Sequence, residues 1–347
     1  MTSYAAAGVS IEAGDRAVEL MAEWVAKARR PEVIGGIGGF AGLFDASALK
    51  SYQRPLLATS ADGVGTKVAI AQAMDRHDTI GLDLVAMLVD DLVVCGAEPL
   101  FLTDYIACGR VVPERIAAIV QGIARGCVLA GCALLGGETA EHPGLLEPDA
   151  YDVAGSTTGV VEADRLLGPD RVRAEDALVA MAASGLHSNG YSLVRHVLLD
   201  QAGWALDRPV AELGRELSEE LLEPTRIYAR DCLALAGAVD VHAMAHITGG
   251  GLAANVSRVL PSVLSARIAR GSWTPPPVFG LVGEVGAVPT PDLERTLNMG
   301  VGMVAVVAAD DADGAVRLLG ERGVEAWVCG EVLGLPGGEA AMDGAHR

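Results

Sequence analysis

The stretch LLATSADGVGTK, residues 56–67, combines three kinds of sequence that together define a structural unit. The apolar residues 56–60 predict a short strand, the glycine-containing segment 61–67 predicts a turn, and a helical pattern begins at Val68. A strand that enters a helix through a glycine turn is typical of anion-binding sites in proteins that mix strands and helices. The sequence therefore predicts a mixed fold with a ligand site at this turn.

The turn carries the residue types that hold a metal–triphosphate. Asp62 supplies a carboxylate at the end of the strand, and Gly63 and Gly65 allow a phosphate to approach the backbone. Thr66 and Lys67 add a hydroxyl and a cation. The alternative interpretation is a plain turn with a surface lysine.

Outside this stretch, the first half of the chain alternates helices, strands and glycine-rich turns. Apolar residues at helical spacing predict helices at 15–29, 80–95 and 114–130, and an apolar run predicts a strand at 100–108. The segment IGGIGGFAG, residues 34–42, contains too many glycines for a stable helix or strand. It predicts a mobile or ligand-ordered loop.

A charged, proline-containing patch at 164–176 separates this half from a second one. We expect one domain at 1–170 and another at 171–347, with a frayed tail from about residue 334. In the second half the pattern predicts strands at 177–183, 301–308 and 324–330 and a helix at 311–322. Because neither half shows a regular strand–helix–strand series, the predicted fold class is α+β, with two domains that each contain a mixed β-sheet and packed helices.

The composition excludes several classes of function. Apolar residues make up 51% of the 347 residues and charged residues 20%, as in globular proteins. The formal net charge of −19 has the wrong sign for binding nucleic acid or an anionic membrane. The chain shows no apolar run long enough for a membrane span, no signal-peptide pattern and no C-x-x-C pair among its six cysteines. We therefore expect a cytoplasmic protein with reduced cysteines and with no nucleic-acid or membrane partner.

Further carboxylates occur in apolar surroundings, where they need an explanation. On the helix predicted at 80–95, Asp83 and Asp90 share one face and Asp91 lies about 100° further round. The segment LLGGET places Glu138 at the end of a strand beside two glycines. Carboxylates in such surroundings are costly unless they are solvated, paired or metal-bound. They suggest a magnesium site, and a solvated helix face is the alternative.

Two histidine-containing loops in the second half each lie between a predicted strand and a predicted helix. The first, SGLHSNG at 184–190, carries His187, Ser188 and Asn189, and the second, HITGGG at 246–251, carries His246, Thr248, Gly249, Gly250 and Gly251. Backbone N–H groups at such junctions can hold a phosphate. The alternatives are flexible loops and structural histidines.

Other ligand-binding motifs fail when they are tested on the sequence. Lys67 follows Thr66 rather than a glycine, which excludes a Walker A loop. Gly36, Gly38 and Ala41 match a loose dinucleotide pattern, but their loop follows a helix instead of a strand. The sequence also contains no G-x-S-x-G elbow, no H-E-x-x-H pair and no complete calcium loop.

Longer strings, in order along most of the chain, resemble one enzyme family. They are RRPEVIGGIGGF (29–40), DGVGTK (62–67), RHDTIGLDLVAM (76–87), GAEPLF (96–101), GGETAE (136–141), YDVAG (151–155), HSNGYSLVR (187–195), PTRIYA (224–229) and HITGGG (246–251). On these strings the chain is similar to the phosphoribosylformylglycinamidine cyclo-ligases, also called aminoimidazole ribonucleotide synthetases. Two positions depart from the family pattern: Asp90, where asparagine is expected, and His142, where methionine is expected.

The resemblance implies a homodimer of two-domain subunits that bind ATP and Mg²⁺ mainly through the N-terminal half. It implies formylglycinamidine ribonucleotide as the substrate and aminoimidazole ribonucleotide, ADP and phosphate as the products. The implied magnesium ligands are Asp62, Asp91 and Glu138, and the implied ATP contacts are Gly35, Gly36, Gly38, Gly39, Asp62, Gly63, Gly65, Thr66 and Lys67. The implied contacts to the ribose phosphate of the substrate are Ser188, Asn189, Thr248, Gly249, Gly250 and Gly251. Lys67, His187 and His246 are the catalytic candidates.

Two other functions stay open within the superfamily that shares these motifs. One is a small-molecule kinase with the same ATP site, and the other is a non-catalytic ATP-binding maturation module. A kinase would transfer phosphate to its acceptor and a maturation module would release none. Phosphate release that depends on the substrate therefore separates both from the cyclo-ligase.

Overall fold

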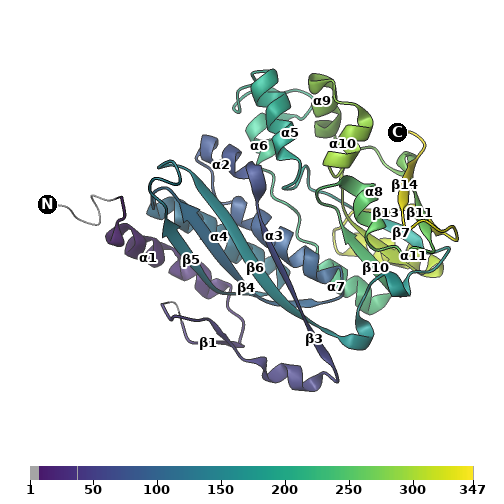
Figure 1. Ribbon diagram of the computed structural model, residues 1–347, viewed down its shortest axis with the longest axis horizontal. Helices are drawn as coiled ribbons and strands as arrows, with labels where there is room; N and C mark the ends of the chain where they lie inside the picture. The colour runs from purple at the N-terminus through teal and green to yellow at the C-terminus, as the bar shows by residue number, and fades with distance from the viewer. Residues whose placement is uncertain (1–7, 37, 347) are drawn as a thin grey trace. The chain divides into compact units, whose positions relative to one another are not determined.

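The computed structural model describes residues 8–36 and 38–346, and the chain divides into two compact units (Figure 1). Within the described ranges, the first unit comprises residues up to 92 and 97–164, and the second comprises 93–96 and the residues from 165 onward. Each unit contains a mixed β-sheet with packed helices, which confirms the predicted α+β class. In the part of the chain that is described, no helix has the length and apolar character needed to span a bilayer.

A four-stranded sheet forms the centre of the first unit, with the strand order β3-β6-β4-β5. The strands are β3 (Pro55–Gly63), β4 (Glu98–Cys108), β5 (Ala133–Glu141) and β6 (Tyr151–Glu162). β6 pairs antiparallel with β3 and β4, and β4 pairs parallel with β5. β3 is longer than predicted because its pairing with β6 continues through Asp62 and Gly63. These two residues therefore end a strand instead of opening a turn.

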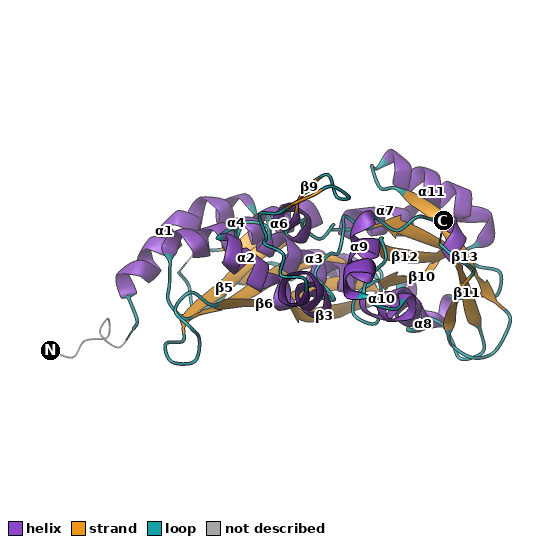
Figure 2. Cartoon of the chain, turned by 90° about the horizontal axis from the view of Figure 1, so that it is seen from above, coloured by secondary structure: helices purple, strands orange, loops and turns teal. Residues whose placement is uncertain are grey.

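Helices cover one face of this sheet (Figure 2). They are α1 (Ile11–Lys27), α2 (Val68–Met74), α3 (Ile80–Val93) and α4 (Pro113–Ala130). α3 and α4 cross at two glycines: a Cβ on Gly81 would lie 2.1 Å from Ile123 N, and one on Gly122 would lie 2.3 Å from Asp78 O. The two helix backbones can approach this closely because neither position has a side chain. A short hairpin, β1 (Val33–Ile34) and β2 (Leu43–Phe44), follows α1 and leads into a 3₁₀ turn at Ala46–Ser51.

The second unit is built on a six-stranded sheet with the order β10-β12-β7-β13-β11-β14. Its strands are β7 (Ala177–Ala182), β10 (Val241–His246), β11 (Ser265–Ala269), β12 (Val301–Val307), β13 (Ala326–Leu333) and β14 (Ala340–Asp343). β12 is buried along its whole length and β7 along most of it, which explains why both appear in the sequence as continuous apolar runs.

The described residues of the second unit also form seven α-helices. They are α5 (Tyr191–Arg195), α6 (Leu217–Leu221), α7 (Ala229–Ala238), α8 (Gly251–Ser257), α9 (Pro277–Gly286), α10 (Thr290–Thr296) and α11 (Ala312–Glu321) among the described residues. α5 continues as a π-helical segment at His196–Gln201, and a small hairpin joins β8 (Pro209–Val210) to β9 (Arg215–Glu216).

The prediction of a frayed tail from residue 334 is wrong for its last part. Ala340–Asp343 forms β14, which pairs parallel with β11. The N–H of Ala340 donates to Ser257 Oγ at 2.8 Å, and Met342 packs against the core of the unit. Backbone pairing and this apolar contact order a segment whose small residues show no strand pattern in the sequence. The six cysteines, all within the described residues, are not joined by disulfides, and five of them are buried.

Candidate active site

A cavity of about 970 Å³ lies in the first unit and is lined by α1, the hairpin loop and the sheet. The loop between β1 and β2 contains the predicted residues Gly35, Gly36, Gly38 and Gly39, which all line the cavity, while residue 37 lies outside the described residues. Gly35 and Gly38 have left-handed φ values of 87° and 96°. Among the described atoms, none lies within 4 Å of a Cβ placed on Gly35, Gly36 or Gly38. The loop therefore presents bare backbone, as a phosphate site requires.

The other walls of the cavity are mainly apolar. Val18 and Met21 of α1, Val120 of α4 and Leu134 of β5 line it, and so does the carboxylate residue Glu138. The cavity therefore brings one predicted metal ligand to the predicted glycine loop. Apolar walls with a few polar groups are typical of pockets for small organic ligands.

Asp104 in the cavity wall is a functional candidate that the sequence analysis missed. It lies on β4 opposite Gly137 of β5 and Gly155 of β6, and a Cβ on Gly137 would lie 2.2 Å from its Oδ1. The carboxyl group therefore lies directly over a glycine. Burial raises the pKa of Asp104 to about 7, because desolvation favours the neutral form. An acidic residue in the middle of the apolar run LFLTDYIAC, residues 100–108, is the signal that could have identified it.

Lys67 is buried rather than exposed at the surface. Its turn, Gly65–Lys67, leads into α2, and its side chain has no exposed area. The ammonium Nζ donates to Asp83 Oδ1 at 2.8 Å, and the Asp83 side chain is equally buried. The structure thus gives Lys67 an interior carboxylate as a partner, where the motif predicted a triphosphate. The alternative of a surface lysine is wrong.

The acidic residues of α3 fall on two different faces. Asp83 and Asp90 share a face, as predicted, and both are fully buried. Asp91, one position further on, is exposed. The solvated-face interpretation therefore applies to Asp91 and is wrong for the other two.

The predicted magnesium ligands Asp62, Asp91 and Glu138 lie on three separate elements, β3, α3 and β5. Asp62 ends β3 and Glu138 lies on β5, and these are the two outer strands of the sheet. Neighbouring strands lie about 4.8 Å apart, so the backbones of β3 and β5, which have two strands between them, are on the order of 14 Å apart. Within the described residues, no group of three or more His, Cys, Asp or Glu side chains could hold a metal ion. The assignment of Asp62, Asp91 and Glu138 as magnesium ligands stays a prediction.

The first histidine loop, residues 184–190, follows β7 in the second unit. His187 is buried, adopts a left-handed φ of 61°, and accepts the N–H of Ser184 on Nε2 at 3.2 Å. In the neutral ring the proton is therefore on Nδ1. The ring of Tyr228 packs 6.1 Å from the ring of His187, between centroids. Ser188 is buried and Asn189 is partly exposed.

The second loop connects β10, which ends at His246, to α8. Gly250 and Gly251 have φ values of 96° and 74°, which favour glycine. Asn255 Nδ2 donates to the backbone oxygens of Thr248, Gly249 and Gly251 at 3.2, 3.2 and 2.9 Å. Asn255, a residue of α8, thus fixes the backbone of the loop through these three hydrogen bonds. The sequence analysis missed it, although a polar residue in the helix that follows HITGGG was a usable signal.

The structure brings these two loops together. β7 and β10 both pair antiparallel with β12, so they run in the same direction and end at the same edge of the sheet. Asn189 Oδ1 lies 3.9 Å from the position of a Cβ on Gly249. The loops predicted to bind one ligand are therefore neighbours.

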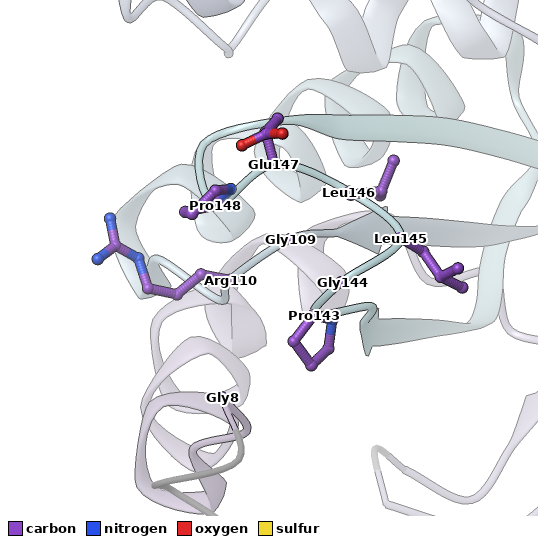
Figure 3. Close-up of a pocket in the computed structure, with 9 residues that line it drawn as sticks. All are labelled: Gly8, Gly109, Arg110, Pro143, Gly144, Leu145, Leu146, Glu147 and Pro148. Atoms are coloured by element: carbon purple, nitrogen blue, oxygen red, sulfur yellow. The ribbon is translucent and has the colours of Figure 1, made fainter.

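A smaller cavity of about 390 Å³ lies elsewhere in the first unit (Figure 3). It is lined by Gly8, Gly109, Arg110 and residues 143–148. Arg110 pairs with Asp149 at 3.2 Å. None of the predicted site residues lines this cavity, so it forms no part of the candidate active site.

Comparisons with known proteins first define the class. The family model for the N-terminal domain of AIR synthase related proteins matches residues 44–161, and the model for their C-terminal domain matches residues 173–343. The chain is thus an AIR synthase related protein in both of its halves.

Curated relatives then identify the particular enzyme family. The phosphoribosylformylglycinamidine cyclo-ligase of Geobacillus kaustophilus (strain HTA426) is 53% identical over 330 residues, which cover 95% of each chain. The enzyme of the same name from Anaeromyxobacter sp. (strain K) is 51% identical over 342 residues, or 98% of each chain. The chain belongs to the phosphoribosylformylglycinamidine cyclo-ligase family, as its motifs predicted, and is a ligase of purine biosynthesis.

Solved structures share the fold at much lower identity. Thiamine-monophosphate kinase from Stenotrophomonas maltophilia K279a matches with a TM-score of 0.67 and 20% identity, over 94% of this chain and 96% of that one. The hydrogenase maturation protein HypE of E. coli matches with a TM-score of 0.66 and 18% identity, over 95% and 93%. HypE in complex with ATP matches with a TM-score of 0.65 and 19% identity, over 98% and 95%.

Proposed function

We propose that this chain converts formylglycinamidine ribonucleotide to aminoimidazole ribonucleotide, consuming ATP and releasing ADP and phosphate. The observation that carries this proposal is the 53% identity to a cyclo-ligase that extends over 95% of both chains. The match omits only about 5% of this chain, so it includes the quoted motif strings of both domains. The product is an intermediate on the route to the purine nucleotide IMP.

The reaction can be understood from its functional groups. The formyl amide oxygen is a poor leaving group, so ATP first phosphorylates it. An amidine nitrogen then attacks the same carbon, the five-membered ring closes, and the oxygen leaves as phosphate. Phosphoryl transfer of this kind depends on alignment and charge neutralisation more than on covalent help from the protein.

The cavity of the first unit is the proposed ATP site. The apolar residues of α1 suit the purine ring, and the bare backbone of Gly35, Gly36, Gly38 and Gly39 suits the phosphates. HypE, which shares the fold, has been solved in complex with ATP.

The turn after β3 supplies further proposed contacts to the phosphates. Its members are Asp62, Gly63, Gly65 and Thr66. Lys67 supports this turn from the interior through Asp83. Its proposed contribution to catalysis is therefore to fix the backbone of the turn.

Magnesium is proposed to enter bound to ATP, where it neutralises phosphate charge. The described carboxylates do not form a three-ligand cage. Mg²⁺ is commonly held by one or two carboxylates together with phosphates and waters, so Glu138 in the cavity wall and the exposed Asp62 and Asp91 are proposed as separate contacts.

The second unit is proposed to hold the ribose phosphate of the substrate. The loop residues Ser188 and Asn189 lie next to Gly249, and the backbone N–H groups of residues 248–251 are the proposed anion donors. His187, with its proton on Nδ1, and His246 at the end of β10 are the candidates for orienting the substrate or moving a proton.

The enzyme is further proposed to be a cytoplasmic homodimer. Among the described residues, helices cover one face of the sheet of the first unit (Figure 2), and Leu57 and Tyr105, which the strand register places on the opposite face, are 66% and 42% exposed. Apolar side chains at such exposure favour contact with another surface. Sedimentation of the purified protein tests the dimer.

The test of the function is phosphate release from ATP and Mg²⁺ with and without formylglycinamidine ribonucleotide, with detection of the aminoimidazole product. We expect release that depends on the substrate and equals the product mole for mole. Transfer of the phosphate to an acceptor would indicate a kinase instead. Folded protein that binds ATP but releases no phosphate at saturating substrate would contradict the proposal.

A further inference from the structure

One segment of the second unit packs against both loops of the proposed phosphate site. This backing segment, residues 294–298, comprises the end of α10 and the two residues after it. A Cβ on Gly251 would lie 1.7 Å from the backbone oxygen of Glu294, and a Cβ on Gly190 would lie 2.4 Å from Leu297 Cδ2. Gly190 closes the first loop and Gly251 closes the second. The same segment therefore limits the position of both loops.

Glycine is required at both contacts for a second reason. Gly190 and Gly251 have φ values of 77° and 74°, in the left-handed region that favours glycine. Each loop therefore approaches the backing segment with its backbone and not with a side chain. Backbone contacts of this kind transmit a displacement of the segment directly to the N–H groups of the loops.

Asn298 joins the backing segment to the first loop. It is 4% exposed, its Nδ2 donates to Gly185 O at 3.0 Å, and its Oδ1 accepts the N–H of Gly300 at 2.8 Å. Met299, between them, has a left-handed φ of 53°, which is uncommon for a residue other than glycine. Its oxygen accepts the indole N–H of Trp273 at 2.9 Å. Strain of this type persists where the surroundings fix the backbone, and it occurs frequently near functional sites.

Glu294 anchors the other end of the segment. Its Oε1 and Oε2 accept from Arg270 Nε and Nη2 at 2.6 and 2.8 Å, and His346 Nε2 lies 3.1 Å from Oε1. The Glu294 side chain is 8% exposed. Arg270 holds the pKa of Glu294 below its ordinary value. A two-point arginine–carboxylate contact fixes orientation as well as distance, so α10 cannot rotate freely against the loops.

We propose that residues 294–298 are the positioning element of the phosphate site, and that Asn298 and Glu294 control substrate affinity through the two loops. The inference rests on the proposed function, because it takes these loops to hold the ribose phosphate. Both residues are positioning residues: Asn298 acts through Gly185, and Glu294 acts through its backbone contact with Gly251. The segment makes none of the ATP contacts proposed for the first unit.

The test compares the kinetics of Asn298→Ala and Glu294→Gln with those of the wild type. For Asn298→Ala we expect the KM for formylglycinamidine ribonucleotide to rise about tenfold, the factor that one lost hydrogen bond produces. The KM for ATP and kcat should stay within about twofold, because the segment does not contact the reacting groups. Glu294→Gln, which keeps the shape but not the charge, should raise the same KM by roughly threefold. Asp292→Asn, at an exposed position of the same helix, is the control and should leave all three constants unchanged.

A second measurement does not depend on turnover. Calorimetric titration of inorganic phosphate into the same proteins should show weaker binding by a similar factor in Asn298→Ala. A lowered melting temperature with unchanged substrate KM and phosphate Kd would overturn the inference, as would equal changes in both KM values and kcat. If the wild type binds phosphate but forms no product, the proposed function fails, and the phosphate titration still decides the inference. If Asn298→Ala does not fold, Glu294→Gln carries the test.

Discussion

Replacing Lys67 with methionine tests whether this lysine stabilises the fold through its ion pair with Asp83 or binds the triphosphate of ATP. The ion pair with Asp83 is 2.8 Å long, and neither side chain has any exposed area. Removing one partner of a buried pair leaves a charge in the interior and costs about 3–5 kcal/mol. For a unit of this size each kcal/mol lowers the melting temperature by about 2–4 °C, so we expect Lys67→Met to lower it by roughly 6–20 °C.

The assay is thermal unfolding followed by circular dichroism, with a double variant and a surface control. Lys67→Met/Asp83→Leu replaces both charges with apolar groups, so we expect it to recover at least half of the loss. Lys50→Met, at an exposed lysine of the same unit, should change stability by less than about 0.5 kcal/mol.

One result would refute the reasoning. If Lys67→Met has the melting temperature of the wild type but binds ATP more weakly, the lysine contacts the triphosphate, as the motif alone predicted. Loss of stability with ATP affinity retained in the variant that still folds would support the interior role.

Three further changes test other parts of the description. Asp62→Asn should abolish most of the turnover while leaving the melting temperature within a few degrees, and unchanged turnover would remove Asp62 from the proposed ATP site. Gly251→Ala should cost roughly 2 kcal/mol or more, because its Cβ would lie 1.7 Å from the backbone oxygen of Glu294 and its φ is 74°; a wild-type melting curve would contradict this packing. Burial raises the pKa of Asp104 to about 7, above its value in an unfolded chain, so its neutral form stabilises the fold at acid pH and this contribution is lost as the pH rises through about 7. Asp104→Asn should therefore flatten the fall in melting temperature between about pH 4 and pH 7, and parallel curves for the two proteins over that range would argue against a raised pKa.

The elements with the clearest periodicity were predicted well from the sequence. The helix expected at 80–95 is α3 (Ile80–Val93), and the helix expected at 114–130 is α4 (Pro113–Ala130). Both depend on local spacing of apolar residues, which a single sequence shows directly. β14 was not predicted, because parallel pairing with β11 orders it and local propensity does not.

In the candidate site too, features that depend on local sequence could be predicted, and features that depend on tertiary packing could not. The glycine loops could be found because each is a continuous string with its own backbone requirement. The partner of Lys67 could not, since Asp83 meets it only through the packing of two separate helical segments. Asp104 was overlooked for a related reason: its position over Gly137 depends on the register of β4 against β5. Which face a strand residue adopts is set by pairing that the sequence does not state.

The place of β7 in its sheet has a consequence for how the protein is made. β7 ends at Ala182, yet its two neighbours, β12 and β13, begin at Val301 and Ala326. During synthesis both edges of β7 therefore stay unpaired until almost the whole chain has left the ribosome, because β12 and β13 are made late. Nascent chains stalled before Val301 should therefore expose an apolar strand and bind chaperones. The loops of the proposed phosphate site in the second unit therefore reach their final positions only near the end of synthesis.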